Sequence, residues 1–304
     1  MKKVNRVLST QTKVMGGKFF ISIVGGNNQN LESAEHFLKS LESKWSRFIP
    51  DSEISVINNA EGKTTEVSTE TLKLVQAAMR ANKITKGYFD PTVLPLLLKS
   101  GYERSRVNPN LETFLPESAS WPGDIQSAQI SENTVKLPRG TTIDPGGIGK
   151  GLAADLVVEM LISQGVAGAL VNANGDVVVE GESPQGGPWL IGIEDPNEPQ
   201  IEIEQIRISS GAVATSSRVH QTWEKAGQKY HHLVNPLTGS TAVTETLSAS
   251  VVCAKGADAE ALAKIPFILE ITEAIQFIER SGAEVFIVDQ KYKVHQSNGW
   301  RKFT

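Results

Sequence analysis

The sequence predicts an α+β protein in which helices pack against a mixed sheet of short strands. Apolar side chains fall at helical spacing between residues 31 and 45, and apolar positions alternate between residues 19 and 24. After residue 165 several short apolar runs follow one another without the regular strand–helix alternation of a parallel α/β fold. Hydrophobic residues make up 39% and charged residues 21%, which excludes wholesale disorder.

The N-terminal half contains one predicted strand and two predicted helices. Residues 19–24 alternate like a strand and end at a Gly-Gly-Asn-Asn turn. Residues 31–45 form an amphipathic helix that lies on the sheet, and a second helix runs over residues 69–86 until Gly87 stops it. Residues 104–124 are rich in Pro, Ser, Asn and Glu, and we expect a loop there.

The C-terminal half begins with a glycine-rich turn at residues 144–151. A helix carrying apolar residues from Leu152 to Leu161 follows and ends near Gly165. Strands are predicted at 169–172 and 177–179, joined by the turn 174–176, and further strands at 189–193, 212–214 and 248–253. Helices at 257–269 and 273–279 precede a last strand at 285–288.

Charge, cysteine content and hydropathy exclude several classes of protein. Thirty Lys and Arg against 34 Asp and Glu give a net charge of −4, and no basic block interrupts the chain, so we expect no nucleic-acid partner. One cysteine, Cys253, cannot form an intramolecular disulfide or a cysteine-rich zinc site. No stretch reaches the roughly 18 apolar residues that span a membrane, and residues 1–17 lack the apolar core of a signal peptide. We expect a cytoplasmic protein, with a removed leader left open.

The glycine-rich turn is the sharpest local signal for a ligand. Its glycines let the backbone approach a ligand, and the following helix offers unpaired N–H groups to a phosphate. The turn is not a Walker loop, because Gly151 follows Lys150 where Ser or Thr is needed, and the third glycine of a Rossmann motif is missing. An ordinary tight turn explains the pattern about equally well.

Two other motifs carry residues suited to ligand binding or catalysis. Tyr88, Phe89 and Asp90 follow the end of a helix, where the rings could stack on a planar ligand and the carboxylate could accept hydrogen bonds. A core phenylalanine and a capping aspartate are the plainer interpretation. His231 and His232 end a strand before a Pro-x-Thr-Gly turn, so only one of them can face a given site, as a general base or as an ordinary loop histidine.

Taken in chain order, these motifs resemble the FAD:protein FMN transferase family (ApbE) over residues 12–288. The most specific parts are Phe89-Asp90-Pro91-Thr92-Val93-x-Pro95, the Asp-x-Gly-Gly-Ile-x-Lys-Gly turn that starts at Asp144, and the His-x-Val-Asn-Pro-x-Thr-Gly turn that starts at His232. Met15-Gly16-Gly17, Ser46-x-Phe48 and the turn 172–176 contribute further matches.

The resemblance implies the architecture and the reaction. It implies a single domain over residues 1–304, built of two intimately packed lobes similar to T-fold units, with a boundary near residues 125–140 and FAD between them. Such enzymes cleave FAD, attach its FMN part through a phosphoester to a Thr or Ser hydroxyl of a partner flavoprotein, and release AMP. A member that binds FAD without transferring it, and one that hydrolyses FAD to FMN and AMP, are the alternatives.

The resemblance also implies the site residues, position by position. His232 corresponds to the histidine that deprotonates the acceptor hydroxyl. The FAD contacts implied are Met15, Phe48, Tyr88, Phe89, Asp90, Asp144, Lys150 and Val234.

The implied magnesium site departs from the family pattern. The family supplies a carbonyl, here that of Gly147, together with an Asp and a Thr four residues apart, where this chain has Glu260 and Lys264. Glu260 can offer oxygen to Mg²⁺, but an ammonium group cannot be a ligand. We therefore hypothesise weak Mg²⁺ binding or none, with Lys264 as a catalytic residue that substitutes for part of the metal's charge.

Overall fold

The core of the fold is one antiparallel sheet of eight strands. The computed structural model describes residues 6–219, 222–225, 228–231, 233–242 and 244–304. Every neighbouring pair in this sheet is antiparallel. In spatial order the strands are β1 (Val7–Val14), β2 (Gly17–Val24), β6 (Gly168–Ala173), β7 (Asp176–Gly181), β10 (Gly211–Ser217), β15 (Thr246–Cys253), β16 (Glu284–Asp289) and β17 (Val294–Gln296).

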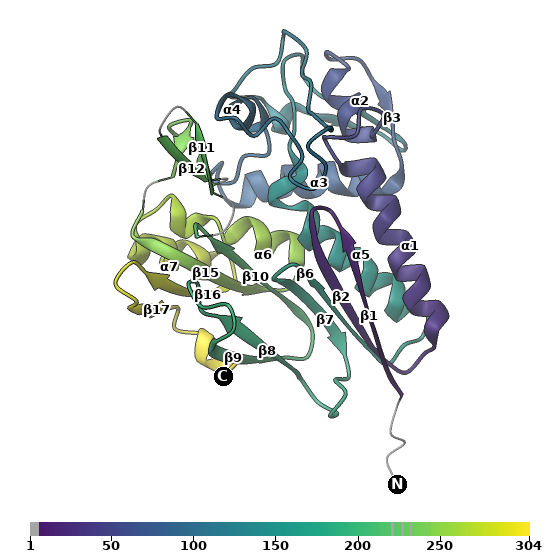
Figure 1. Ribbon diagram of the computed structural model, residues 1–304, viewed down its shortest axis with the longest axis vertical. Helices are drawn as coiled ribbons and strands as arrows, with labels where there is room; N and C mark the ends of the chain where they lie inside the picture. Colours follow the sequence, from purple (N-terminus) through teal and green to yellow (C-terminus); the bar gives the residue numbers. More distant parts are fainter. Residues whose placement is uncertain (1–5, 220–221, 226–227, 232, 243) are drawn as a thin grey trace.

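Helices cover one face of this sheet and extend beyond its edge (Figure 1). The middle helices α5 and α6 lie against the sheet, and α1 runs alongside α5 (Figure 1). The helices are α1 (Asn28–Trp45), α2 (Glu53–Asn59), α3 (Thr69–Ile84), α4 (Leu94–Lys99), α5 (Gly149–Ser163), α6 (Gly256–Leu262) and α7 (Ile271–Arg280).

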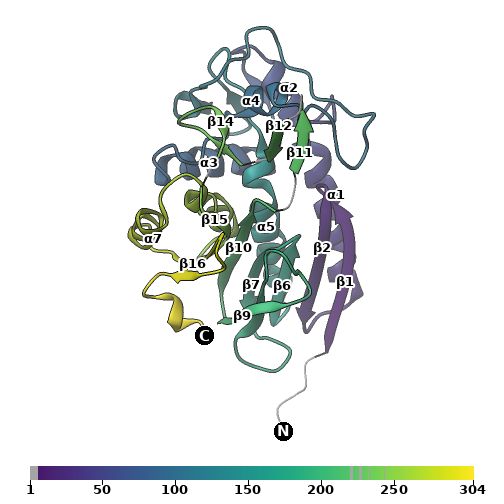
Figure 2. The ribbon, with the colours of Figure 1, turned by 60° about the vertical axis from the view of Figure 1, so that its left-hand side comes forward.

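Four smaller sheets complete the described part of the chain. The hairpin of β8 (Trp189–Glu194) and β9 (Glu202–Ile208) covers the face of the large sheet opposite α5 (Figure 2). The other small sheets are β3 (Thr65–Glu66) with β5 (Thr134–Lys136) and β4 (Gln129–Ile130), β11 (Thr222–Lys225) with β12 (Gln228–His231), and β13 (Val234–Asn235) with β14 (Ser240–Thr241). Short 3₁₀ turns lie at Ile125–Ser127, Pro145–Gly147, Ile265–Phe267 and Trp300–Lys302.

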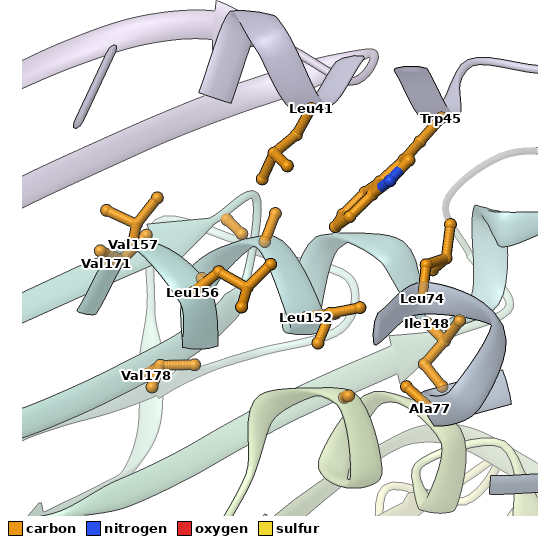
Figure 3. Close-up of a cluster of buried hydrophobic side chains, with 14 of the residues drawn as sticks. Leu41, Trp45, Leu74, Ala77, Ile148, Leu152, Leu156, Val157, Val171 and Val178 are labelled. Atoms are coloured by element: carbon orange, nitrogen blue, oxygen red, sulfur yellow. The ribbon is translucent and has the colours of Figure 1, made fainter. Parts of the chain in front are cut away.

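The largest apolar core lies between the sheet and the helices, and Figure 3 shows part of it. The apolar stripe of α1 points into this core and ends with Trp45, whose indole N–H donates to Thr71 on α3. Each fully buried large apolar side chain stabilises the fold by roughly 1.5–3 kcal/mol. The core contains side chains from both sides of residues 125–140, and the division into two lobes there stays a prediction.

The predicted α+β class and most predicted elements are confirmed. The expected helix over 257–269 is wrong as one element: α6 ends at Leu262 and a 3₁₀ turn follows, because Pro266 lacks the N–H that a continuing helix needs. The strand at 285–288 is not the last, since β17 pairs with it. The sequence did not predict β1, β9, α2 or α4, nor most of the strands of two to four residues. None of the helices in the described ranges is long and apolar enough to span a membrane.

Candidate active site

A pocket of about 430 Å³ opens where the sheet's helices meet the loops of the N-terminal half. This volume is within the range of pockets that enclose a cofactor-sized ligand. Its wall comes from the end of α1, the segment before α4, the loop 102–111, the glycine-rich turn, the turn after β12 and the 3₁₀ turn after α6. Predicted site residues that line it are Met15, Phe48, Tyr88, Phe89, Asp90, Asp144, Gly147, Lys150, Val234 and Lys264.

Several of the residues that line the pocket carry aromatic rings. We call the rings of Phe48, Tyr88, Phe89 and Tyr102 the aromatic end. Thr85 holds Phe89 in place, since its hydroxyl accepts from the Phe89 N–H at 3.0 Å. Tyr88 packs edge-on against Phe277 of α7, at 5.6 Å between ring centroids. The rings are therefore held before any ligand binds.

One carboxylate oxygen of Asp90 accepts hydrogen bonds within the local turn. Its Oδ1 accepts from both the backbone N–H and the hydroxyl of Thr92, each at 2.8 Å. Asp90 thus caps the turn before α4, as the plainer interpretation of the sequence had it, while still lining the pocket. Met15 is fixed by its backbone, because its N–H donates to Glu42 Oε1 at 2.6 Å.

Arg47 is a buried site residue that the sequence reasoning missed. Its guanidinium lies over the rings of Phe48 and Tyr102, at 4.1 and 4.7 Å from their centroids, and its Nε lies 3.2 Å from Asp144 Oδ1. Its other nitrogens donate to Thr113 Oγ1 and to the Tyr102 carbonyl. The residue ties the loop after α4 to the glycine-rich turn, and the only available sequence signal was its position inside Ser46-x-Phe48.

The other end of the pocket is a cluster of charges, and we call Lys150, Asp176, Glu260 and Lys264 the ionic end. Lys150 Nζ bonds to Asp176 Oδ2 and lies 3.2 Å from Glu260 Oε1. Both carboxylates are only 3% exposed. Burial by itself would lower the pKa of Lys150, but the two carboxylates outweigh it and raise that pKa above its usual range. Asp176 was noted in the sequence only as part of a polar turn.

The start of α6 is fixed against α5, and this positions Glu260 and Lys264. Asp155 on α5 accepts from the backbone N–H groups of Gly256 and Ala257 at 2.7 and 3.0 Å. Burial raises the pKa of Asp155 to about 6, and these two N–H donors act in the opposite direction. Glu260 Oε2 in turn accepts from the Gly151 N–H at 2.8 Å, so α6 is bonded to the glycine-rich turn.

Lys264 extends from the end of α6 back to the glycine-rich turn. Its Nζ donates to the carbonyl of Gly147 at 2.8 Å and to that of Glu260 at 2.7 Å. It also lies 5.8 Å from the centroid of the Phe89 ring, where the two ends of the pocket meet. Burial lowers the pKa of Lys264, and the Glu260 carboxylate partly offsets this effect.

The residues predicted as magnesium ligands do not fit a metal as they are arranged. The Gly147 carbonyl faces an ammonium group, and the Glu260 oxygens accept from Lys150 and from the Gly151 N–H. A hard cation needs several free oxygen ligands and no cation beside them. Within the ranges that the structure describes, no group of three or more His, Cys, Asp or Glu is placed to hold a metal ion.

Two predicted residues lie apart from the pocket wall. Glu260 is beneath it and reaches the site through Lys150 and Gly151. His232, the predicted base, falls outside the described residues, although its neighbours Leu233 and Val234 line the pocket.

An antiparallel α+β fold whose pocket is lined by aromatic and charged residues beside a glycine-rich turn indicates a protein that binds a small molecule there. A model of the ApbE family matches residues 15–287, and the chain belongs to that family. The resemblance noted in the sequence is thereby confirmed.

Individual relatives agree over nearly the whole chain. A FAD:protein FMN transferase of Haemophilus influenzae is 27% identical over 326 residues, which cover 100% of this chain and 93% of the relative. One of Vibrio cholerae is 29% identical over 280 residues, covering 88% and 83%. Among solved structures, the ApbE protein of Thermotoga maritima has a TM-score of 0.85 at 26% identity and covers 98% of this chain and 99% of its own. The flavin transferase ApbE of Vibrio cholerae has a TM-score of 0.79 at 24% identity, with coverage of 99% and 100%, and supports the fold.

Proposed function

We propose that this protein is a FAD:protein FMN transferase, which attaches the FMN part of FAD to a Thr or Ser hydroxyl of a partner flavoprotein. The observation that carries the proposal is the convergence of residues distant in the sequence on one pocket. Ten positions that the family resemblance assigns to FAD, the metal or catalysis lie in its wall. The names of the relatives supply the reaction, and the pocket supplies a place for its substrate.

The two ends of the pocket suit the two parts of FAD. The rings of the aromatic end offer faces and edges to the planar isoalloxazine. The glycine-rich turn offers the start of the fifteen-residue helix α5, where the positive end of the helix dipole favours an anion although Glu260 already accepts from the Gly151 N–H, and we place the diphosphate at the ionic end. Lys264 lies between these two parts, next to the Phe89 ring.

The reaction requires one nucleophile, one leaving group and one base. The acceptor hydroxyl oxygen attacks the phosphorus of the FMN part and forms a new P–O bond. The P–O bond to AMP breaks, and AMP leaves with the bridging oxygen and its electron pair. The hydroxyl proton passes to His232, the base that the family resemblance implies, and histidine is the side chain whose ordinary pKa suits proton transfer near neutral pH.

Mass spectrometry of the acceptor tests this proposal. The protein is incubated with FAD and a threonine-bearing acceptor flavoprotein, and we expect the acceptor to gain the mass of FMN with one AMP released per label. His232→Ala should bind FAD as the unchanged protein does and lose transfer.

Three other outcomes would contradict transfer, each in its own way. AMP without a labelled acceptor indicates a hydrolase. Bound FAD without AMP release indicates a protein that carries FAD without cleaving it. If no FAD binding is detected, FAD is excluded as the ligand of the pocket. Unchanged transfer by the His232→Ala variant would exclude His232 as the base.

A further inference from the structure

Lys264 stands where the family resemblance places a threonine ligand of Mg²⁺, and its ammonium group bonds to the carbonyl of Gly147, which was predicted as another ligand. Its Nζ lies between two backbone carbonyl oxygens, those of Gly147 and Glu260, at 2.8 and 2.7 Å. Carbonyl oxygens are groups that a hard cation would otherwise bind. Here they accept hydrogen bonds from an ammonium group that belongs to the chain itself.

The packing around Gly147 fixes this ammonium group. A Cβ at Gly147 would lie 2.9 Å from the Phe89 ring and 3.1 Å from Lys264 Cε, so ring, turn and lysine stem are in close contact. Lys264 also lines the pocket, which places its charge next to any ligand bound there. The side chain is therefore both held by the protein and turned toward the ligand.

The surrounding charges leave little attraction for a second cation. Lys150 and Lys264 carry two positive charges against the two negative charges of Asp176 and Glu260. A divalent ion that binds the Gly147 carbonyl must either displace the ammonium group of Lys264 or lie next to it. Two neighbouring positive charges repel each other strongly in a buried site. A diphosphate, in contrast, can accept from the ammonium group itself, because the two carbonyls use only two of its three N–H donors.

We propose that the ammonium group of Lys264 takes the place of the divalent cation, so that this protein holds the diphosphate of FAD without Mg²⁺. The proposal rests on the proposed function in taking FAD as the ligand, and it needs no acceptor. Lys264 then binds the phosphates of the ligand, and the site needs no metal ion for this task.

Binding measurements with two flavins test the proposal. FAD and riboflavin are titrated into the protein by fluorescence, with excess EDTA or with excess MgCl₂. For the unchanged protein we expect the Kd of FAD to be the same in both buffers. Lys264→Met keeps much of the stem and removes the charge, and it should weaken FAD binding about tenfold or more. Riboflavin has no phosphate, and its Kd should not change.

The controls separate a role in recognition from a role in packing. Lys255→Met alters an exposed lysine just before α6 and should leave both affinities unchanged. Equal weakening of FAD and riboflavin by Lys264→Met would overturn the proposal, since a lysine that merely supports the pocket affects both ligands. The proposal would also be overturned if the unchanged protein bound FAD only in the presence of Mg²⁺. This measurement uses the unchanged protein, so it tests the proposal even if the variant does not fold.

A calorimetric titration of Mg²⁺ into the flavin-free protein completes the test. We expect no saturable heat, and saturable binding would overturn the proposal without any reference to FAD. Failure of the proposed function has a different signature. If FAD binds without Mg²⁺ and no acceptor is ever labelled, transfer is wrong while the role of Lys264 stands.

Discussion

The aromatic end and the ionic end of the pocket are held in different ways. Within the aromatic end, Tyr88 is held by a ring contact with Phe277 and Phe89 by a neutral hydrogen bond to Thr85, whereas the Arg47 guanidinium lies over the other two rings. The ionic end consists of buried charges that balance one another, with Lys150 between two carboxylates. Loss of a ring removes contact area, whereas loss of a buried charge leaves its partners unpaired in a medium that penalises them. The ionic end is therefore the more cooperative of the two.

Removal of Lys150 should produce the largest effect on stability. Lys150→Met leaves Asp176 and Glu260 buried without their cation, and breaking a buried pair in this way costs about 3–5 kcal/mol. Urea unfolding should show this loss. The loss should be smaller at pH 5 than at pH 8, because burial raises the pKa of Asp176, and without Lys150 this carboxylate becomes neutral as the pH falls.

A surface ion pair provides the matched control for Lys150. Lys44 pairs with Glu70 at 2.7 Å, and both side chains are 27% exposed. Lys44→Met should cost less than about 1 kcal/mol, since water can solvate the remaining carboxylate. Similar losses in the two variants would mean that the ionic end is not a cooperative cluster.

Arg47 is the exception within the aromatic end, and its removal should produce the next largest effect. Arg47→Met removes the cation beside Asp144 and the hydrogen bonds that Arg47 donates to Thr113 and to the Tyr102 carbonyl. We expect a loss of about 2–3 kcal/mol in the free energy of unfolding, because the carboxylate is partly exposed.

Loosening of the loop after α4 should accompany that loss. Hydrogen exchange should be faster in residues 102–113 than in the unchanged protein. Arg104→Met in the same loop removes a pair with Glu112 whose arginine is 66% exposed, and it should leave both stability and exchange unchanged. Unaltered exchange in the Arg47 variant would exclude Arg47 as the residue that holds this loop.

The aromatic end was easier to predict from the sequence than the ionic end. Tyr88 and Phe89 are neighbours in one motif, so a local pattern is enough to find them. Lys150, by contrast, meets Asp176 and Glu260, which lie 26 and 110 residues further along the chain. Only the pairing of β6 with β7 and the packing of α6 on α5 bring these charges together, and no local pattern contains that information.

The main error in the predicted helices has a different, local cause. Amphipathic spacing was sufficient for α1 and α3, which present one apolar stripe to the core, whereas α5 is buried almost all round and was predicted from its apolar run before Gly165. The break at Pro266 was overlooked because the apolar residues on both sides of it are buried and look like one helix face. The resemblance to a family identified Lys264 as unusual, but the oxygens that its ammonium group contacts became known only from the structure.

Close backbone packing at the ionic end gives a third, smaller prediction. A Cβ at Gly151 would lie 2.3 Å from the Gly256 carbonyl oxygen, a backbone atom that cannot move aside cheaply. Gly151→Ala should therefore cost about 1–3 kcal/mol by forcing α5 and α6 apart. Gly149→Ala, two residues earlier in α5, meets nothing closer than Pro145 Cβ at 3.6 Å and should be neutral or stabilising. Equal effects in urea unfolding would show that the two helices are not tightly packed here.

The smallest predicted effect on stability is that of Phe89→Leu, and here the affinities for FAD and riboflavin distinguish the two ends of the pocket. Phe89→Leu preserves most of the volume of a buried side chain, so the free energy of unfolding should fall by no more than about 1.5 kcal/mol. The loss of a stacking ring should weaken flavin binding about three- to tenfold. FAD and riboflavin should be weakened equally, because both carry the isoalloxazine ring, whereas Lys264→Met should weaken FAD alone. Phe114→Leu is the control, since that ring is 70% exposed and lies off the pocket wall. Selective weakening of FAD by Phe89→Leu would mean that Phe89 contacts another part of the dinucleotide, and the assignment of the two ends would then have to be reversed.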